Sequence, residues 1–263
     1  MDFKMSGEMR KMPSAMLMPS GVSDWARVFA MRQLALSSPH APAYLLAPEV
    51  AVLLSYLPDL RQRMFFETMW NTGARPNEAL ALTPAALLFK QAMPAIKLLT
   101  LKQRNRGAGR PGKNDLPVRD VPVWDSAYRE RMTALVATLK IKVNEPLWPV
   151  SPDTISRWLK RAIDAAECDG VTFSIEPIIP KSFRHSFAMH ILFNRIHPKV
   201  LQGLMGHKSF KSTEVYTKLF LFDIAGQHQV DFGFDVQQAK LTMLQKDNLP
   251  QSTPGFTRRD SLE

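Results

Sequence analysis

The sequence predicts a mainly α-helical fold that carries one small antiparallel β-sheet. Several segments between residues 46 and 222 place apolar residues at the spacing of a helix face. One region departs from that spacing, because two strand-like runs flank a loop rich in glycine, proline and basic residues. The length of 263 residues allows one large domain plus an arm, or two smaller domains, with a sizeable core.

Residues 1–45 are predicted to form an arm that precedes the main domain. Residues 1–20 are rich in Met, Ser and Pro without periodicity, whereas residues 22–36 have the apolar spacing of one helix. The run SSPHAP at residues 37–42 has the composition of a linker. The amino terminus lacks the continuous apolar stretch of a signal peptide. The main domain is therefore expected to span residues 46–235.

The first part of the main domain is predicted to be helical and to lead into the sheet. Residues 46–82 favour two or three helices, in which Pro48 suits a first turn and Gly73 suits a helix end. Residues 95–102 and 116–123 then predict two strands around a basic hairpin.

A further helix is predicted over residues 151–166. Ser151 can cap its first turn, and Pro152 occupies the first helical position. Its apolar stripe consists of Ile155, Trp158, Leu159, Ala162 and Ile163. Three basic residues lie off that stripe, and they fit a solvated face as well as a DNA-contacting one: Arg157, Lys160 and Arg161.

The remaining segments predict more helix and then a tail. Two helical stretches at residues 183–195 and 198–206 precede the run TEVYTKLFLF at residues 213–222. Residues 236–263 return to polar sequence without a pattern and are predicted to be a tail.

The charge balance favours a polyanionic partner. The chain has 34 Lys and Arg residues against 24 Asp and Glu, a net charge of +10. Such an excess is typical of nucleic-acid binding. A membrane partner is not expected, because no run approaches the ~18 uncharged apolar residues of a spanning helix. A cytoplasmic location is the corresponding expectation.

Metal and thiol chemistry find little support in the sequence. Cys168 is the only cysteine, which excludes an internal disulfide and a thiolate-cluster metal site. Glu167 and Asp169 flank it and disfavour a thiolate, so Cys168 is interpreted as a small packing residue. A zinc site built from His185 and His190 would lack a third ligand at a recognisable spacing.

Four residues in distinctive settings could together break a phosphodiester. Without metal or ATP this reaction needs cations around the non-bridging oxygens, an acid for the leaving 5′-oxygen and a nucleophile. Arginine suits the first task because its planar fork binds phosphate oxygens and stays charged. The candidates are Arg75 in TGARPNEAL, Arg184 in PKSFRHSFAMHI, His207 in LMGHKS and Tyr216 in STEVYTK. Taken singly, either arginine could equally belong to a structural ion pair.

The order and spacing of these residues resemble the tyrosine recombinase (phage integrase) family. That family has an arginine after a Thr-Gly turn, an HxxR box, a Leu-Gly-His turn and a nucleophilic tyrosine. The likeness covers residues 46–222, and Glu78, three residues after Arg75, fits an acidic position of the family. Within the family the chain is most similar to the plasmid multimer resolution enzymes.

The resemblance implies a tyrosine recombinase catalytic domain that acts on paired sites in double-stranded DNA as a synaptic tetramer. Tyr216 would attack the scissile phosphate and leave a 3′-phosphotyrosyl link. Arg75, Arg184 and His207 would stabilise the pentacoordinate phosphate. No cofactor and no metal would be needed, because one phosphodiester replaces another.

The resemblance also points to two lysine positions. Lys181 stands where the HxxR box usually has histidine, and a charged lysine supports the phosphate charge better than it accepts a proton. The family's general-acid lysine lies in the β-hairpin, where Lys102 is chosen because it ends the first predicted strand. The cations assigned to DNA binding are Arg104, Arg106, Arg110, Lys113, Arg157, Lys160 and Arg161.

The nucleophile is selected among four tyrosines. Tyr44 lies beside the linker, Tyr56 lies in an apolar run interpreted as core, and Tyr128 lies on a polar segment. Tyr216 remains, and its spacing from His207 outweighs the ordinary interpretation of a tyrosine before KLFLF as a core residue. The other histidines in this region are interpreted as packing or surface residues: His185, His190 and His197.

Parts of the sequence also fit one competing motif and two rival functions. The run GAGRPGKN at residues 107–114 resembles a phosphate-binding loop, but Asn114 lacks the hydroxyl for magnesium and a strand follows where the motif needs a helix. A type IB topoisomerase would use the same residues without pairing DNA sites. A DNA-binding regulator with a decayed active site is the second rival, and Lys181 leaves room for it.

Overall fold

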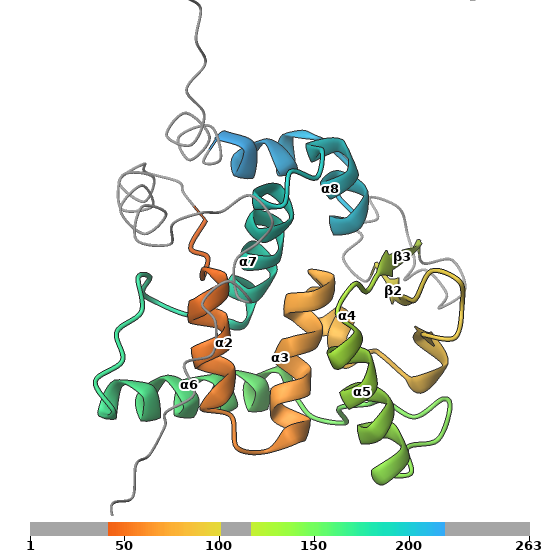
Figure 1. Ribbon diagram of the computed structural model, residues 1–263, viewed down its shortest axis with the longest axis horizontal. Helices are drawn as coiled ribbons and strands as arrows, with labels where there is room; N and C mark the ends of the chain where they lie inside the picture. Colours follow the sequence, from red (N-terminus) through yellow and green to blue (C-terminus); the bar gives the residue numbers. More distant parts are fainter. Residues whose placement is uncertain (1–41, 101–116, 219–263) are drawn as a thin grey trace, which may run out of the picture. The chain divides into compact units, whose positions relative to one another are not determined.

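Helices make up most of the described chain, which is residues 42–100 and 117–218 of a computed structural model (Figure 1). The helical elements are α2 (Ala47–Ser55), α3 (Leu60–Thr72), α4 (Pro76–Leu80), the 3₁₀ turn η2 (Pro84–Ala86), α5 (Ser126–Thr138), α6 (Pro152–Cys168), α7 (Pro180–Phe193) and α8 (Pro198–Met205). A last helix begins at residue 211 and occupies the described residues through 218. The strands are β1 (Leu87–Leu88), β2 (Ala95–Leu99) and β3 (Val118–Pro122).

Helices α3 and α7 pack against each other in the hydrophobic core. Helix α3 also contacts α2, α4 and α5. Phe66 of α3 and Phe183 of α7 are both fully buried, with ring centroids 5.0 Å apart. Burying each such ring stabilises the fold by about 1.5–3 kcal/mol. This packing matters for the site because Arg75 follows α3 and Arg184 lies on α7.

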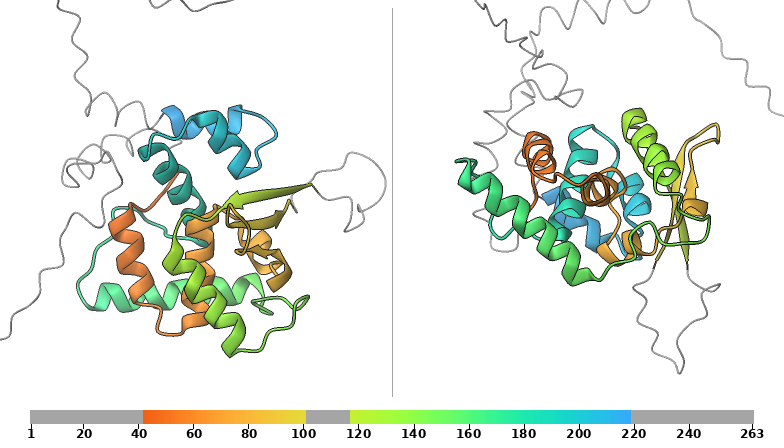
Figure 2. Two further views of the ribbon diagram at one scale, coloured as in Figure 1. Left: turned by 45° about the vertical axis from the view of Figure 1, so that its right-hand side comes forward. Right: turned by 90° about the horizontal axis from the view of Figure 1, so that it is seen from below.

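The sheet is antiparallel, with the strand order β1-β2-β3. In its register Ile96 faces Val121 and Leu98 faces Arg119, so the two longer strands form the predicted hairpin pair. Both views of Figure 2 show the sheet beside α5 and away from α2. The predicted mainly α-helical class with a small antiparallel sheet is confirmed, and β1 is an additional short strand.

Most predicted helices are confirmed, with small shifts at their ends. Residues 46–82 form α2, α3 and α4, with Pro48 in the first turn of α2 and Gly73 at the end of α3. Helix α6 begins as predicted, since the Ser151 hydroxyl accepts a hydrogen bond from the Thr154 N–H at 3.2 Å. Of its predicted stripe, Trp158 and Ile163 are only partly buried.

Helix α5 was not predicted, and it buries Tyr128. Asp125 caps this helix, and Tyr128, Met132 and Leu135 form its buried face. Tyr128 is fully buried, and its hydroxyl lies 2.7 Å from the Thr68 hydroxyl of α3. The segment is polar overall, but one apolar residue per turn is enough to bury a narrow face.

Two smaller predictions were wrong. Cys168 is exposed rather than a packing residue, because it ends α6 outside the buried stripe that runs to Ala166. Tyr56 is only partly buried, because it ends α2 and its hydroxyl donates to Asp169 at 3.0 Å. Tyr44, placed beside the linker from sequence, is buried in the core.

Several sequence predictions fall beyond the described residues. The helix predicted at residues 22–36 and the tail predicted at residues 236–263 lie outside them. No helix among the described residues is long and apolar enough to cross a membrane.

Candidate active site

A glycine turn places Arg75 at the start of α4. Gly73 has a left-handed φ of 61°, and its N–H donates to the Met69 carbonyl at 2.9 Å. A Cβ atom at residue 73 would lie 2.3 Å from a ring carbon of Phe187, so a side chain there would separate α3 from α7. The Thr-Gly turn therefore has a packing reason as well as a conformational one, and both determine where Arg75 points.

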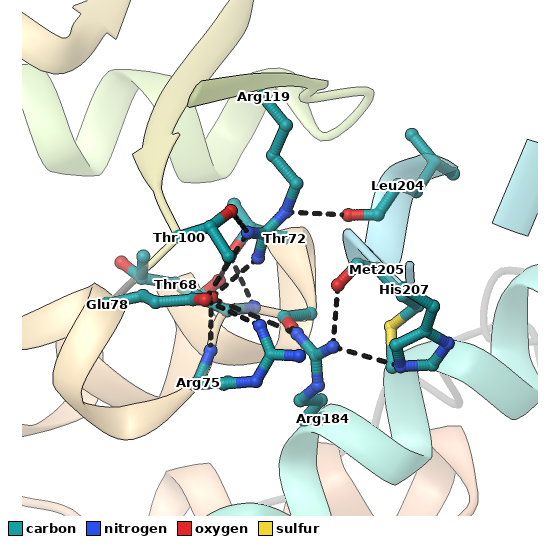
Figure 3. Close-up of polar contacts among 12 residues, drawn as sticks. Thr68, Thr72, Arg75, Glu78, Thr100, Arg119, Arg184, Leu204, Met205 and His207 are labelled. Atoms are coloured by element: carbon teal, nitrogen blue, oxygen red, sulfur yellow. Dashed lines mark hydrogen bonds and ion pairs between the residues drawn. The ribbon is translucent and has the colours of Figure 1, made fainter. Parts of the chain in front are cut away.

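Glu78 is the carboxylate that holds Arg75 in place. Its side chain is 0% exposed, and Oε1 accepts from the Arg75 guanidinium at 2.6 Å. Oε2 accepts from the Arg75 backbone N–H at 2.9 Å and from Arg119 Nη2 at 2.6 Å. Burial alone would raise the pKa of Glu78, but the hydrogen bond and charge of Arg119, then those of Arg75, outweigh burial and lower this pKa. Glu78 is therefore ionised and neutralises part of an arginine cluster (Figure 3).

Arg119 is a residue of the site that was not predicted from the sequence. It lies on β3, where Nε donates to the Leu204 carbonyl at 3.0 Å and Nη1 donates to the Thr100 hydroxyl at 3.2 Å. One side chain thus joins the sheet, α4 and the end of α8. A signal was available, because Arg119 and the buried Val121 are two residues apart on the same strand and share one face.

Arg184 is buried at 4% exposure and is held by backbone carbonyls. Nη1 donates to the Gly73 carbonyl, and Nη2 donates to the Met205 carbonyl at 2.6 Å. Burial, followed by the charge of Arg75, lowers the pKa of Arg184 to about 9. The guanidinium therefore stays charged at neutral pH, with both arms fixed before any substrate binds.

His207 lies within reach of Arg184 because α8 ends in a second glycine turn. Gly206 has a left-handed φ of 62°. Arg184 Nη2 lies 3.2 Å from His207 Nε2, and His207 Nδ1 lies 2.9 Å from the Thr213 hydroxyl. Because a guanidinium only donates, Nε2 accepts and Nδ1 carries the ring proton. Burial, then the charge of Arg184, lowers the pKa of His207 to about 4, so the ring is neutral at neutral pH.

Tyr216 lies on the last described helix, next to two histidines. Its side chain is buried, its ring is parallel to the His207 ring with centroids 6.4 Å apart, and its hydroxyl lies 2.8 Å from His185 Nδ1. Burial raises the pKa of Tyr216 to about 12, although the charges of Arg184 and Arg75 act in the opposite direction. The phenol is therefore protonated at rest and needs an acceptor for its proton before or during any attack.

A pocket of about 750 Å³ opens beside these residues, where α4, α6 and α7 begin. Arg75, Arg184 and Lys181 line it, together with the Ser156 side of α6. The first two guanidiniums and the exposed Lys181 ammonium make it suited to an anion such as a backbone phosphate. A larger pocket of about 1010 Å³ between β1 and α5 contains none of these groups.

Comparison with known protein families decides the identity of the fold. The family model described as the phage integrase family matches residues 44–221, which is more than half of the chain. The chain belongs to the phage integrase family.

Relatives of this tyrosine recombinase agree with the family match. A protein from Escherichia coli named "Resolvase" is 46% identical over 236 residues, covering 84% of this chain and 90% of the relative. A second "Resolvase", from Escherichia coli strain K12, is 42% identical over 261 residues, covering 89% and 97%. A tyrosine recombinase XerD of Corynebacterium glutamicum is 29% identical over 194 residues, covering 68% and 58%. The predicted family is confirmed, and the chain is a site-specific tyrosine recombinase.

Solved structures support the fold. The XerH site-specific recombinase bound to difH substrate matches with a TM-score of 0.51 at 18% identity, covering 67% of this chain and 50% of that one. This recombinase therefore spans half the length of XerH. The Tn1549 transposon integrase in complex with transposon right end DNA matches with a TM-score of 0.53 at 19% identity, covering 79% and 67%.

The structure brings together five of the six residues predicted to be catalytic. Arg75 and Arg184 both approach Glu78, and His207 contacts Arg184. Tyr216 lies against His207, and Lys181 lines the pocket together with the two arginines. Lys102 and the loop cations predicted to bind DNA lie outside the described residues: Arg104, Arg106, Arg110 and Lys113. The cations of α6 are exposed and do not line the pocket: Arg157, Lys160 and Arg161.

The structure also bears on the ion-pair interpretation of Arg75, on a metal site and on the remaining histidines. The ion-pair interpretation of Arg75 is correct in part, since Arg75 pairs with Glu78 at 2.6 Å while it also lines the pocket. Within residues 42–100 and 117–218, no group of three or more His, Cys, Asp or Glu is arranged to hold a metal ion. His190 packs against Trp70, with ring centroids 4.7 Å apart, and the exposed His197 caps α8.

Proposed function

We propose that this recombinase cuts and rejoins double-stranded DNA through a 3′-phosphotyrosyl link on Tyr216. The observation that carries the proposal is a chain of neighbours: the guanidiniums of Arg75 and Arg184 line one pocket, the neutral His207 contacts Arg184, and the buried Tyr216 lies against His207. Arg75 and Arg184 lie within hydrogen-bond or ion-pair range of the same carboxylate, at 2.6 and 3.9 Å from Glu78. Two guanidiniums held in fixed positions can donate hydrogen bonds to the non-bridging oxygens, which carry the negative charge of the phosphate in the transition state.

In the proposed reaction, Tyr216 Oη attacks the scissile phosphorus and the 5′-oxygen of the next nucleotide leaves. Arg75 and Arg184 stabilise the extra negative charge of the pentacoordinate phosphate, and His207 assists them through its contact with Arg184. Lys181 adds positive charge at the pocket, and Lys102 donates the proton to the leaving oxygen. One phosphodiester replaces another, so the reaction as drawn uses no cofactor and no metal.

The DNA itself is proposed to bind across the basic surface around the pocket. The net charge of +10 favours a polyanion, and solved relatives of this fold are complexes with DNA. The proposed DNA-binding residues are those of α6, Arg157, Lys160 and Arg161, together with the hairpin residues Arg104, Arg106, Arg110 and Lys113. Because α6 begins at the pocket, its exposed cations are suited to phosphates that flank the scissile one.

The biological reaction is proposed to be the resolution of plasmid multimers in the cytoplasm. The support is the name "Resolvase" carried by relatives at 42% and 46% identity over most of the chain. Resolution requires two DNA sites, so we propose synapsis by four copies of the chain. In that assembly residues 46–235 would be the catalytic domain, residues 1–45 an arm and residues 236–263 a tail.

A nicked suicide substrate tests the proposed function. The oligonucleotide carries a candidate recombination site with a nick beside the scissile phosphate, so the short leaving strand diffuses away and the covalent complex accumulates. We expect an SDS-stable protein–DNA band with wild-type protein and none with Tyr216→Phe, which keeps the ring but lacks the attacking oxygen. A band that persists in Tyr216→Phe would overturn the assignment, and no band with the wild type on any site would favour a regulator with a decayed site.

A plasmid assay separates recombination from topoisomerase activity. A type IB topoisomerase relaxes a supercoiled plasmid that has no specific site, whereas a resolvase acts on a plasmid with two sites and yields two circles. We expect two circles from the two-site plasmid, and relaxation that needs no site would support the rival.

The general acid is tested by a substrate whose leaving 5′-oxygen is replaced by sulfur. Sulfur leaves without a proton, so this substrate rescues a variant that lacks the general acid. We expect rescue of Lys102→Ala and no rescue of Lys113→Ala, which removes a lysine of the same hairpin. The reverse pattern would move the role to Lys113.

A further inference from the structure

His185 contacts the atom that attacks the phosphate. It follows Arg184 on α7, and its Nδ1 lies 2.8 Å from the hydroxyl oxygen of Tyr216. The two ring centroids lie 5.7 Å apart and the ring planes are tilted by 48°, so the hydrogen bond rather than parallel stacking is the close contact. From the sequence alone, His185 was predicted to be only a packing or surface residue.

The direction of this hydrogen bond follows from the protonation of its two partners. Burial, then the charges of Lys181 and Arg184, lower the pKa of His185 to about 4. The phenol of Tyr216 has a raised pKa, so at neutral pH it holds its proton. The phenol therefore donates to the lone pair of Nδ1, and the imidazole proton sits on Nε2. A neutral imidazole is already oriented to receive the proton that Tyr216 must lose.

The other polar groups that face His185 or Tyr216 are poorer proton acceptors. Lys181 occupies the place of the histidine in the HxxR box, and a charged ammonium has three donors and no lone pair. Arg184 on the same helix donates only, and the Nε2 atom of His207 already accepts from Arg184. The groups that face His185 are thus Lys181 and Arg184 from α7, His207 from the loop after α8 and Tyr216 from the last helix.

We propose that His185 accepts the phenolic proton of Tyr216 during strand cleavage and returns it during ligation; this rests on the proposed function. As the Oη–phosphorus bond forms, the phenolic oxygen becomes more acidic and its proton passes to Nδ1, which leaves an imidazolium. The phosphorus–O5′ bond breaks, and the leaving oxygen takes a proton from the general acid. In ligation the 5′-hydroxyl attacks the phosphorus and gives its proton to the now deprotonated general acid, the phosphotyrosyl bond breaks, and the imidazolium gives its proton back to Tyr216.

The first test compares His185→Gln with His190→Gln in the full-length protein. Both histidines are on α7, and burial lowers the pKa of His190 to about 4 as well, but His190 packs against Trp70. In single-turnover cleavage of the suicide substrate, we expect His185→Gln to be slower by about 10²-fold or more, as for loss of a general base. His190→Gln should cleave at nearly the wild-type rate. If His185→Gln does not fold, His185→Asn carries the same comparison, because its side-chain oxygen takes the place of Nδ1.

The second test separates proton transfer from a structural role. Tyr216 is replaced by a trifluorotyrosine, whose phenol is far more acidic and depends less on a base. We expect this replacement to restore much of the cleavage rate in the His185→Gln background and to change the His190→Gln background little. A His185 that merely holds the tyrosine in place would show no such recovery.

The outcomes distinguish this inference from the proposed function. If wild-type protein forms no covalent complex, the proposed function fails. If wild-type protein forms the complex while His185→Gln cleaves as fast as His190→Gln, or faster than wild type, only the role of His185 fails. The absence of recovery with the fluorinated tyrosine would overturn that role as well.

Discussion

Replacing Glu78 by glutamine tests whether the arginine cluster depends on one buried carboxylate. Glutamine has nearly the same shape, but it carries one acceptor oxygen and an amide that donates. In the native protein Oε1 accepts from Arg75 at 2.6 Å, and Oε2 accepts from Arg119 at 2.6 Å. In Glu78→Gln the amide NH2 group replaces one of these oxygens, so an N–H donor of the glutamine faces an N–H donor of Arg75 or Arg119.

The expected loss of stability follows from the burial of the group. Glu78 is 0% exposed and Arg119 is 9% exposed, so solvent compensates little for the lost charge. Removing one partner of a buried ion pair costs about 3–5 kcal/mol of stability. Because the remaining oxygen of the glutamine still accepts hydrogen bonds, we expect Glu78→Gln to lower the free energy of unfolding by about 3 kcal/mol. The free energy of unfolding from urea titration at 25 °C measures this loss.

Glu67→Gln is the matched control. Glu67 is also a buried carboxylate that holds two arginines, Arg63 at 2.8 Å and Arg131 at 2.9 Å, but it lies away from the pocket. Those arginines are 41% and 36% exposed, so solvent screens them and we expect a smaller loss of about 1 kcal/mol. Both variants raise the net charge by one, so neither should weaken the binding of DNA.

Catalysis should separate the two variants. In Glu78→Gln the guanidinium of Arg75 loses its fixed position, and loss of one preorganised donor costs about 10²–10³ in rate. Cleavage of the suicide substrate should therefore fall by about 10² in Glu78→Gln, while Glu67→Gln cleaves normally. If both variants cleaved at the same rate, Glu78 would have no role in positioning the arginines.

Two other outcomes follow from charge and from burial. DNA affinity should fall steeply as the salt concentration rises. Joint replacement of Arg157, Lys160 and Arg161 by alanine should reduce the slope of log binding constant against log salt concentration by about 0.9 for each side chain that contacts a phosphate. An unchanged slope would show that α6 is not part of the DNA interface. Burial lowers the pKa values of His185 and His190 to about 4, so below about pH 6.5 these histidines bind protons in the unfolded chain but not in the folded protein. The fold therefore loses stability as the pH falls from about 6.5 toward 4. Each should contribute about 1 kcal/mol between about pH 7.5 and about pH 5.5, so His190→Gln should reduce the pH dependence of urea unfolding, and an equal dependence in the variant would contradict the burial argument.

The sequence was most informative where a residue's role depends on a local turn. Gly73 and Gly206 have left-handed backbones and lead directly to the segments of Arg75 and His207, so the spacing of these motifs could be recognised without a structure. Pro48 and Ser151 likewise predicted helix starts from chemistry within one turn. Local patterns therefore predicted most helices and the strand pair β2 and β3.

Contacts between residues far apart in sequence were not predictable in the same way. Arg119 meets Glu78 across 41 residues and Leu204 across 85, so nothing in its own neighbourhood identified its partners. His185 meets Tyr216 across 31 residues, and its interpretation as packing took account only of α7. Helix α5 was missed for a related reason, because Tyr128 shows its buried character only against Thr68 of α3.

The most direct test of the central claim, that Tyr216 is the nucleophile, is to identify the amino acid attached to DNA. The covalent complex formed on the suicide substrate is digested with protease and nuclease, and the peptide that carries a nucleotide is sequenced by mass spectrometry. We expect the nucleotide on Tyr216, joined through its 3′-phosphate, with a free 5′-hydroxyl on the released strand. A nucleotide on Tyr44, Tyr56 or Tyr128, or a link through a 5′-phosphate, would contradict the claim.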